Sequence, residues 1–518
     1  MSHHAARARF TQLVAVARDA SRKTGRRTLA SMVTRIADTD PLRALETVAA
    51  LAPAADTAPF SIRMFWTRPA DRFALAGIGA AMTFSPEGAD RFATIDREWQ
   101  TLVADAVSDD GSDGAPGAGP GLMGGFAFDP EGPHTSAWRD FPAANLFVPS
   151  MQFAQVGHDC WLTTNVLVGE DSPDAGAVTA LMDMRALLLR DVDDLSDVTD
   201  LSDVTDRTLL WEEPDAASLS TCDVRPAADW RGTVLDAVAA IDGGKLEKVV
   251  LAREVRAAAG QDFDVFASLT QLRDAHQTSY VFGVWLGESV FIGATPERLV
   301  RVDGSRVEAS SLAGSVSRGG TASADRHLAA SLLGSAKDRA EHEIVRRALV
   351  NGLARLCDDV TAADGPTLLT LPNVHHLHTE VFARLRAGHT LLQLVAQLHP
   401  TPAVGGEPRN AALRFIREHE KMDRGWYAAP VGWLQRDCGE FAVALRSALV
   451  QGAEARLFAG CGIVAGSDAD DEYAESLLKL RPMENALAAV RVATEPKPSV
   501  SECVPADIPG AGFGGAMS

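Results

Sequence analysis

The sequence is 518 residues long, which is enough to bury a large hydrophobic core. Hydrophobic residues make up 46% of the chain and charged residues 23%, as is usual for a soluble globular protein. The formal net charge of −20 argues against nucleic acid and anionic membranes as main partners, although a small anionic substrate needs only a local basic pocket.

Membrane, secreted and disulfide-rich classes are also disfavoured. No apolar run approaches the roughly 18 residues of a membrane span, and the first residues lack the apolar core and cleavage site of a signal peptide. The six cysteines are scattered, without a Cys-x-x-Cys pair, which favours a reduced protein over a disulfide scaffold or a zinc module. We therefore expect a cytoplasmic protein.

The first part of the chain shows alternating helical and strand-like patterns. Residues 1–58 are rich in Ala and Arg and predict mainly helix. Strand-like runs follow at 60–66 and 72–80, and Asp, Gly and Pro at 107–121 predict a surface loop. Gly124-Gly-Phe-Ala-Phe128 predicts a buried strand.

Two further segments carry no core pattern. A tandem repeat of Leu-Ser-Asp-Val-Thr-Asp fills residues 195–206, and its acidity predicts a solvated loop. A calcium site there would lack the glycine turn and the bidentate glutamate of an EF-hand. Residues 495–518, rich in Pro, Gly and Ser, predict a disordered tail. The dense pattern of elements, and the candidate chemistry, lie between residues 222 and 490.

A lysine stands at the start of a buried strand in this region. A helix-like run from Asp229 to Ile241 ends at a pair of glycines, and Lys248-Val-Val-Leu-Ala-Arg253 then predicts a strand. A lysine that enters a buried strand loses hydration unless it has a partner or has lost its proton. The alternative is a lysine at the mouth of a strand with its head in water.

The first of three carboxylate-bearing segments is a turn. Apolar residues 290–292 lead into Gly293-Ala-Thr-Pro, and Glu297 follows directly. A carboxylate beside a buried strand can act as a general acid if burial raises its pKa. The alternative is a surface ion pair or a charge at a helix N-terminus.

The second and third segments are helical. Residues 337–356 predict a helix whose apolar face contains Val345 and Leu349, and Glu341 lies one turn earlier on that side. In a later helix, Glu472, Glu475 and Lys479 are spaced by three and four residues and share one face. Carboxylates from two helices suit Mg²⁺, which prefers oxygen ligands, and the lysine suits a substrate carboxylate. The alternative for the later helix is a surface stripe of ion pairs.

Weaker signals complete the residue-level picture. Arg446 is a charge within an apolar strand-like run and needs an anionic partner. The run Gly460-Cys-Gly462 would let backbone approach a ligand closely. His375, His376 and His378 alternate along a predicted strand, so that they cannot all face one metal ion.

Taken together and in this order, the segments resemble the chorismate-utilising enzymes, which include isochorismate, salicylate, anthranilate and aminodeoxychorismate synthases. The resemblance covers roughly residues 222–490 and extends weakly to Gly124–Phe128. The matching motifs are Lys248-Val-Val-Leu-Ala-Arg253, Gly293-Ala-Thr-Pro-Glu297, Leu312-Ala-Gly-Ser315, Glu341-His-Glu343, His376-Leu-His-Thr379, His399-Pro-Thr-Pro-Ala-Val-Gly405, Arg424-Gly-Trp-Tyr427, Pro430-Val-Gly-Trp433, Gly460-Cys-Gly462, and Glu472-Tyr-Ala-Glu475 with Lys479.

The resemblance implies an α+β fold with α/β/β/α layers, in which two large antiparallel sheets pack face to face under outer helices. Residues 1–215 would form the less recognisable N-terminal part, residues 222–490 the chorismate-binding catalytic region, and residues 495–518 the tail. The two main parts would interleave in one globule. A monomer is expected.

The resemblance also implies the reaction, which is the Mg²⁺-dependent conversion of chorismate to isochorismate for menaquinone or siderophore biosynthesis. Lys248 resembles the water-activating base, and Ala313 stands where aminodeoxychorismate synthases have a nucleophilic lysine. Both positions favour water over ammonia, so that no glutaminase subunit is expected. The alternatives are a salicylate synthase with the same site and, further off, a non-catalytic chorismate-binding protein.

Site residues carried over from the family's motifs fall into three groups. The implied catalytic residues are Lys248 as base and Glu297 as acid. The implied Mg²⁺ ligands are Glu341, Glu475 and Glu472. The implied substrate-binding residues are Gly314, Ser315, His376, Thr379, Tyr427, Arg446, Gly460, Gly462 and Lys479.

Two departures from the family pattern carry structural expectations. Ala429 replaces the usual glycine before Pro430, which puts the backbone of that loop in question. Pro482 falls within the last predicted helix and is expected to end or kink it.

Overall fold

The computed structural model describes residues 3–51, 60–196 and 219–489, apart from residues 110, 113, 133, 171, 172 and 174. The predicted tail at 495–518 and almost all of the acidic repeat at 195–206 lie outside this range. Among the described helices, none is both long and apolar enough to cross a membrane.

The elements before residue 197 are mostly strands with helices between them. In order they are α1 (His3–Thr24), β1 (Thr28–Ile36), α2 (Pro41–Leu51), β2 (Arg63–Arg68), η1 (Pro69–Asp71), β3 (Phe73–Phe84), α3 (Arg91–Ala104), β4 (Val107–Asp109), β5 (Leu122–Phe126), η2 (Ser136–Trp138), β6 (Ala144–Val156), β7 (Asp159–Val168) and α4 (Ala175–Ser196).

The later part has the same character. Its elements are β8 (Ser220–Asp223), α6 (Ala227–Asp242), β9 (Lys248–Ala258), α7 (Val265–Ala275), β10 (Tyr280–Leu286), β11 (Ser289–Thr295), β12 (Arg298–Asp303), β13 (Arg306–Ser317), α8 (Ala322–Gly334), α9 (Ala336–Leu353), β14 (Cys357–Ala362), β15 (Thr367–Thr370), β16 (Val374–Leu385), α10 (Leu391–Leu398), β17 (Gly406–Glu407), α11 (Arg409–His419), β18 (Pro430–Leu434), β19 (Cys438–Val443), β20 (Ser447–Gln451), β21 (Glu454–Ile463) and α12 (Ala469–Leu487).

Strand β6 is the branch point of the sheet. One edge of β6 pairs with β3 over most of its length. The other edge pairs first with β5 and then with β7. From β3 a first wing continues through β2, β10, β11, β20, β21 and β9. From β5 a second wing continues through β18, β19, β12, β13 and β16. Hydrogen bonds therefore join all the described strands into one branched sheet.

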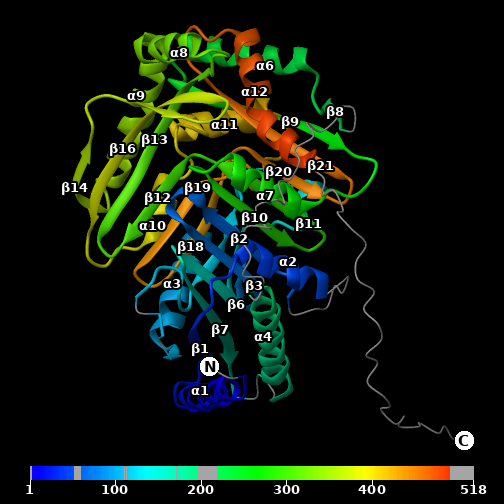
Figure 1. The fold of residues 1–518 in the computed structure, drawn as a ribbon. Helices are drawn as coiled ribbons and strands as arrows, with labels where there is room; N and C mark the ends of the chain where they lie inside the picture. Colours follow the sequence, from blue (N-terminus) through cyan, green and yellow to red (C-terminus); the bar gives the residue numbers. More distant parts are fainter. Residues whose placement is uncertain are drawn as a thin grey trace, which may run out of the picture.

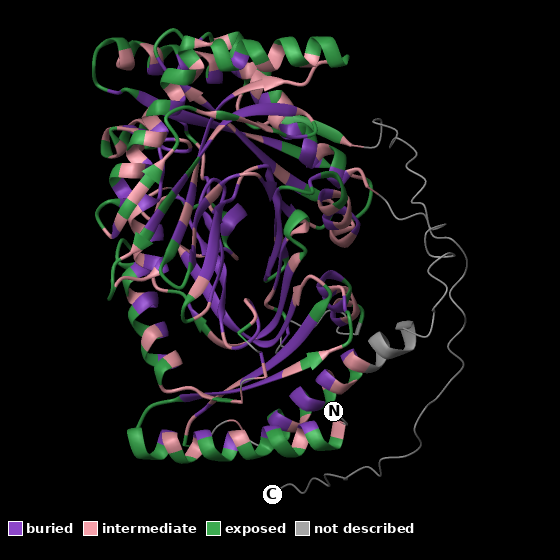
Figure 2. Ribbon diagram, turned by 60° about the vertical axis from the view of Figure 1, so that its left-hand side comes forward, coloured by how far each residue is buried: buried purple, intermediate pink, exposed green. Residues whose placement is uncertain are grey.

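The two wings are the two sheets expected from the sequence. They face one another, because Phe73 of the first wing stacks near Trp433 of the second, and the Tyr280 hydroxyl of the first donates to Glu440 of the second at 2.6 Å. The central strands of the two wings are largely buried (Figure 2). The pairs within both wings are antiparallel, whereas β1 and β4, beyond β7, run parallel.

Helices cover the outer faces of both wings (Figure 1). Helices α6, α7 and α12 pack on the first wing, and α8, α9 and α10 pack on the second. The expected layered α+β fold is therefore confirmed. Residues of the N-terminal part contribute strands to both wings, since β2 pairs with β10 and β5 pairs with β18.

Two local predictions hold only in part. The described part of residues 1–58 is mainly helical as expected, in α1 and α2, but residues 28–36 form β1, which is mostly buried and pairs along its whole length with β7. Its Ala- and Ser-containing sequence carries no strong strand signal, so tertiary pairing decides its conformation. Pro482 does not end the last helix, because α12 continues to Leu487; a kink at Pro482 stays a prediction.

Candidate active site

One pocket lies where the far edges of the two wings approach each other. Strands β9 and β21 of the first wing line it, together with β13 and β16 of the second wing and helices α9 and α12. All but one of the site residues expected from the sequence line this pocket, namely Lys248, Glu297, Gly314, Ser315, Glu341, His376, Tyr427, Arg446, Gly460, Gly462, Glu472, Glu475 and Lys479.

Thr379 is the exception. It lies three positions from His376 on β16, so its side chain points to the opposite face of the strand. There its hydroxyl is 2.8 Å from Nε2 of the buried His342 on α9. Thr379 is therefore not among the residues that line the pocket, and its contact with a ligand stays a prediction. Thr379 instead contacts the helix that carries Glu341.

Lys248 is buried at the start of β9, as the strand pattern predicted. Only 1% of its side chain is exposed, and its Nζ lies 2.8 Å from Oε1 of Glu341. Backbone on both sides fixes it, because β17 pairs with residues 248–249 and β21 pairs with residues 249–258. The alternative of a lysine with its head in water is excluded.

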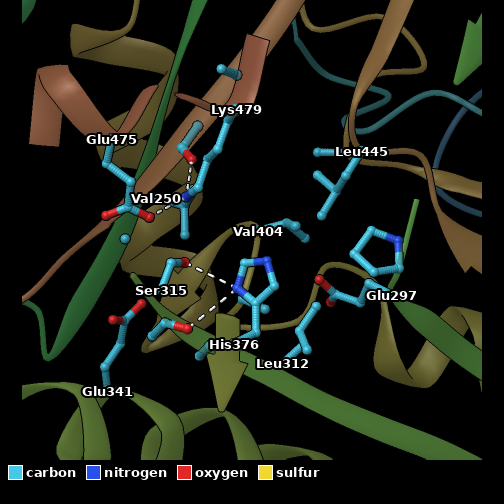
Figure 3. Close-up of a pocket in the computed structure, with 18 of the residues that line it drawn as sticks. Val250, Glu297, Leu312, Ser315, Glu341, His376, Val404, Leu445, Glu475 and Lys479 are labelled. Carbon is cyan, nitrogen blue, oxygen red and sulfur yellow. Dashed lines mark hydrogen bonds and ion pairs between the residues drawn. The ribbon is translucent and has the colours of Figure 1, made fainter. Parts of the chain in front are cut away.

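Glu297 lies in the turn between β11 and β12 and is 4% exposed. Burial raises its pKa to about 8, against the opposing influence of Lys248, Arg446 and Lys479. The carboxyl group therefore holds its proton at neutral pH, which is the form that can donate one. In Figure 3, Glu297 lies on the opposite side of the pocket from Glu341 and Glu475.

Three carboxylates on the other side of the pocket each contact a different lysine. Glu341 pairs with Lys248, Glu475 pairs with Lys479 at 2.7 Å, and Glu472 pairs with Lys337 at 3.2 Å. The surface-stripe alternative for α12 is therefore wrong, because Glu472 is 4% exposed and both glutamates line the pocket.

The two carboxylates of α12 lie in different environments, which shift their pKa values in opposite directions. Burial works to raise the pKa of Glu475, but Lys479 outweighs burial and the pKa lies below its usual value. Burial and the neighbouring Glu475 raise the pKa of Glu472. In the other direction, burial works to lower the pKa of Lys479, whereas Glu475 raises it by more, so that the ammonium stays charged.

The donor set fits a hard divalent cation. The ligand atoms of Glu472, Glu475 and Cys461 all lie within 4.8 Å of one another. Burial raises the pKa of the Cys461 thiol well above its usual value, and its Sγ donates to the backbone oxygen of Glu472 at 3.1 Å. The protonated thiol is engaged as a hydrogen-bond donor and is therefore a poor metal ligand. The carboxylate oxygens remain as ligands, and oxygen is the ligand atom that Mg²⁺ prefers.

Arg446 reaches the pocket from a strained backbone position. Its φ of 48° lies in the left-handed region, which non-glycine residues adopt uncommonly and which is enriched at active sites. Ala428, also lining the pocket, has a φ of 62°. Ala429 itself does not have a positive φ, so a glycine is not needed at that position. The left-handed conformation of this loop is adopted by Ala428 instead.

His376 connects Arg446 to β13. Its Nε2 lies 3.3 Å from Nη2 of Arg446, and its Nδ1 lies 3.3 Å from the Gly314 oxygen and 3.1 Å from the Ser315 hydroxyl. Burial and Arg446 lower the pKa of His376 well below its usual value. A neutral ring that donates from Nδ1 and accepts at Nε2 satisfies these contacts. His375, on the opposite face, contacts Asp325 instead.

Glycines on β21 allow side chains to crowd the pocket floor. A Cβ on Gly462 would lie 2.3 Å from Oε1 of Glu341 and 3.0 Å from Cε of Lys248, and a Cβ on Gly460 would lie 2.9 Å from the Tyr427 hydroxyl. Lys479 donates to the Gly460 oxygen at 2.8 Å. The Gly-Cys-Gly run thus provides space for the lysine and carboxylate groups as well as for a ligand.

Several lining residues carried no separate signal in the sequence. Lys337 and Asp338 line the pocket from the first turn of α9, four and three residues before Glu341. Helical spacing places residues three and four apart on one face, which could have indicated them. The apolar wall of Val250, Val404 and Leu445 combines three distant segments, and only the fold reveals it.

A family model described as chorismate binding enzyme matches residues 13–488. The chain belongs to the family of chorismate-binding enzymes. It is 36% identical over 434 residues to isochorismate synthase MenF of Bacillus subtilis, covering 83% of this chain and 88% of the relative. It is 38% identical over 432 residues to the salicylate biosynthesis isochorismate synthase of Pseudomonas aeruginosa, covering 82% and 85%.

The fold of this chorismate-binding enzyme is similar to a solved structure of MenF, the menaquinone-specific isochorismate synthase from Escherichia coli. The TM-score is 0.68 at 23% identity, and the match covers 92% of this chain and 99% of the other. The match includes the N-terminal part, where the sequence motifs are sparse.

Proposed function

We propose that this chorismate-binding enzyme is an isochorismate synthase, which supplies menaquinone or siderophore biosynthesis. The observation that carries the proposal is that one pocket contains both a buried lysine, Lys248, and a buried glutamate, Glu297, that keeps its proton at neutral pH. Binding of chorismate alone would need neither group. Relatives over most of the chain are named isochorismate synthases.

Lys248 is the proposed base. With its amine in the neutral form, Lys248 accepts a proton from a water molecule, and the water oxygen forms a bond to ring carbon C2 of chorismate. The ring double bonds move, and the bond between C4 and its hydroxyl breaks. Glu297 donates its proton to the departing hydroxyl, which leaves as water. One water is added and one is released, so the reaction is an isomerisation.

The remaining pocket residues bind and orient the dianionic substrate. Arg446, held by His376, and Lys479, held by Glu475, supply positive charge for the carboxylates. The Tyr427 hydroxyl and the backbone near Gly314, Ser315, Gly460 and Gly462 complete the binding surface. Glu341, Glu475 and Glu472 would hold Mg²⁺, which when bound neutralises the ring carboxylate of the substrate.

Water as the nucleophile makes an ammonia supply unnecessary. Lys248 occupies the base position, and Ala313 lines the pocket where a nucleophilic lysine would otherwise stand. We therefore propose that the protein works without a glutaminase subunit. As a separate proposal, we take the protein to be a monomer.

The identity of the product tests this function directly. Purified protein with chorismate and Mg²⁺ near neutral pH is expected to give a mixture of chorismate and isochorismate, and the same mixture should form from isochorismate. NMR spectroscopy distinguishes the two compounds. Stoichiometric pyruvate with fluorescent salicylate, formed without a separate lyase, would assign the protein as a salicylate synthase instead.

The pH dependence of kcat/KM tests the role of Glu297. Its pKa is raised from 4.5 to about 8 by burial, so the proton-donating form is present below that pH and is lost above it. We expect kcat/KM to fall as the pH rises through about 8, by up to tenfold per pH unit. A profile that stays flat to pH 10 would contradict a general acid at this position.

A further inference from the structure

Strand β9, which begins with Lys248, has an incomplete edge. One edge pairs with β21 over residues 249–258. On the other edge, β17 pairs with residues 248–249 and β8 pairs with residues 255–258. No described strand runs beside residues 250–254, so the backbone groups of that stretch need other partners.

A buried ion pair supplies two of these partners. Glu420, directly after α11, accepts from the Ala252 amide through Oε2 at 2.8 Å. Arg424 donates from Nη2 to the Val250 oxygen at 2.9 Å. The two side chains bind each other in a two-point contact, with Nε to Oε1 at 2.7 Å and Nη2 to Oε2 at 2.6 Å. The pair therefore fills two of the places that a neighbouring strand would take, next to the Gly405 oxygen that accepts from the Val250 amide and the Trp230 indole that donates to the Ala252 oxygen.

The same guanidinium also binds a second segment of the apolar wall of the pocket. Arg424 donates from Nη1 to the Val404 oxygen at 2.8 Å. Val250 and Val404 both line the pocket, and Val250 lies two residues after Lys248. One planar group thus fixes two backbone oxygens from segments that are 154 residues apart. The face of the guanidinium lies 4.2 Å from the Phe128 ring, which limits its movement.

We propose that Glu420 and Arg424 act as a positioning pair, which sets the location of Lys248 and the apolar wall of Val250 and Val404 relative to the substrate. This inference rests on the proposed function, because it assigns the pair's purpose to the isochorismate synthase reaction. Neither residue lines the pocket, so the pair acts through the backbone.

A fold-stabilising role alone would give a different result on substitution. The side chains of Glu420 and Arg424 are 2% and 4% exposed, and removal of one partner leaves an unpaired buried charge. Removal of both charges together often restores stability, because neither ion then has to be desolvated. Stability and positioning can therefore be separated by a double substitution.

The test compares Glu420→Gln/Arg424→Met with Glu254→Gln/Arg456→Met. The control removes an ion pair between the same strand β9 and its neighbour β21, away from the pocket. We expect both double variants to be folded, with melting temperatures near that of the wild type. Only the first should lose about tenfold or more in kcat with a smaller change in KM, since misplacement of a base slows the chemical step.

Hydrogen exchange provides a readout that does not depend on activity. The Ala252 amide should exchange faster in Glu420→Gln/Arg424→Met than in the wild type and the control. Normal kcat and unchanged exchange in a folded first variant would overturn the proposal, as would equal kcat losses in both variants. If the wild type formed no isochorismate, the proposed function would be wrong. Independently of that result, unchanged exchange at Ala252 would show that Glu420 and Arg424 do not hold the backbone of β9 in place.

Discussion

Lys248→Gln and Glu297→Gln are each expected to lower kcat by about 10²- to 10⁴-fold, the usual loss when a general base or acid is removed. Both replacements preserve approximate shape, and the amide of Lys248→Gln can still donate to Glu341. Steady-state kinetics with chorismate and Mg²⁺ provides the measurement. Lys245→Ala, three residues earlier and exposed, and Glu288→Gln, on an exposed turn, are matched controls that should keep wild-type rates.

Stability distinguishes a lost catalytic group from a lost fold. Because burial raises the pKa of Glu297 to about 8, ionisation of this carboxyl opposes folding between its unfolded pKa near 4.5 and pH 8. Glu297→Gln should therefore gain thermal stability relative to the wild type as the pH rises from 5 to 8, while remaining nearly inactive. If Lys248→Gln kept a near-normal kcat, the proposed water activation would be wrong.

Removal of divalent metal is expected to abolish turnover, and added Mg²⁺ is expected to restore it. Glu341 pairs with Lys248 and Glu475 pairs with Lys479. Bound Mg²⁺ has to compete with these ammonium groups for the carboxylates. Glu341→Gln and Glu475→Gln should therefore lose Mg²⁺ affinity in calorimetric titration as well as activity.

Glu343 provides the matched control for the metal experiment. It lies on the same helix as Glu341, but its side chain is half exposed and pairs with Arg346. Glu343→Gln should bind Mg²⁺ and turn over chorismate as the wild type does. Full turnover by the wild type in buffer treated with EDTA would show that the carboxylates serve some other purpose.

The sequence predicted the residues that line the pocket better than it predicted the surrounding fold. Lys248, Glu297, Glu341 and Glu475 could be named because ordered motifs identify them. Thr379 was grouped with these residues by motif membership, which ignores strand parity, and the parity turns its side chain toward α9.

The fold beyond the motifs was less accessible. β1 was missed because its pairing with β7 joins segments more than 120 residues apart and leaves little local pattern. The branching at β6 arises because β5 and β7 pair with successive parts of one edge of β6, while β3 pairs with the other edge. This arrangement depends on segments that are distant in the sequence. The Glu420–Arg424 contact depends on a gap along β9 that no single segment reveals.

The origin of the new hydroxyl group is the most direct test of the Lys248–Glu297 account. Chorismate and Mg²⁺ are incubated with the enzyme in ¹⁸O-labelled water, and the early product is analysed by mass spectrometry and ¹³C NMR. The account predicts one ¹⁸O atom, bound to C2 of isochorismate, in every molecule formed. Isochorismate that carries no ¹⁸O would show that the hydroxyl moves within the substrate, and would contradict attack by a water molecule activated by Lys248.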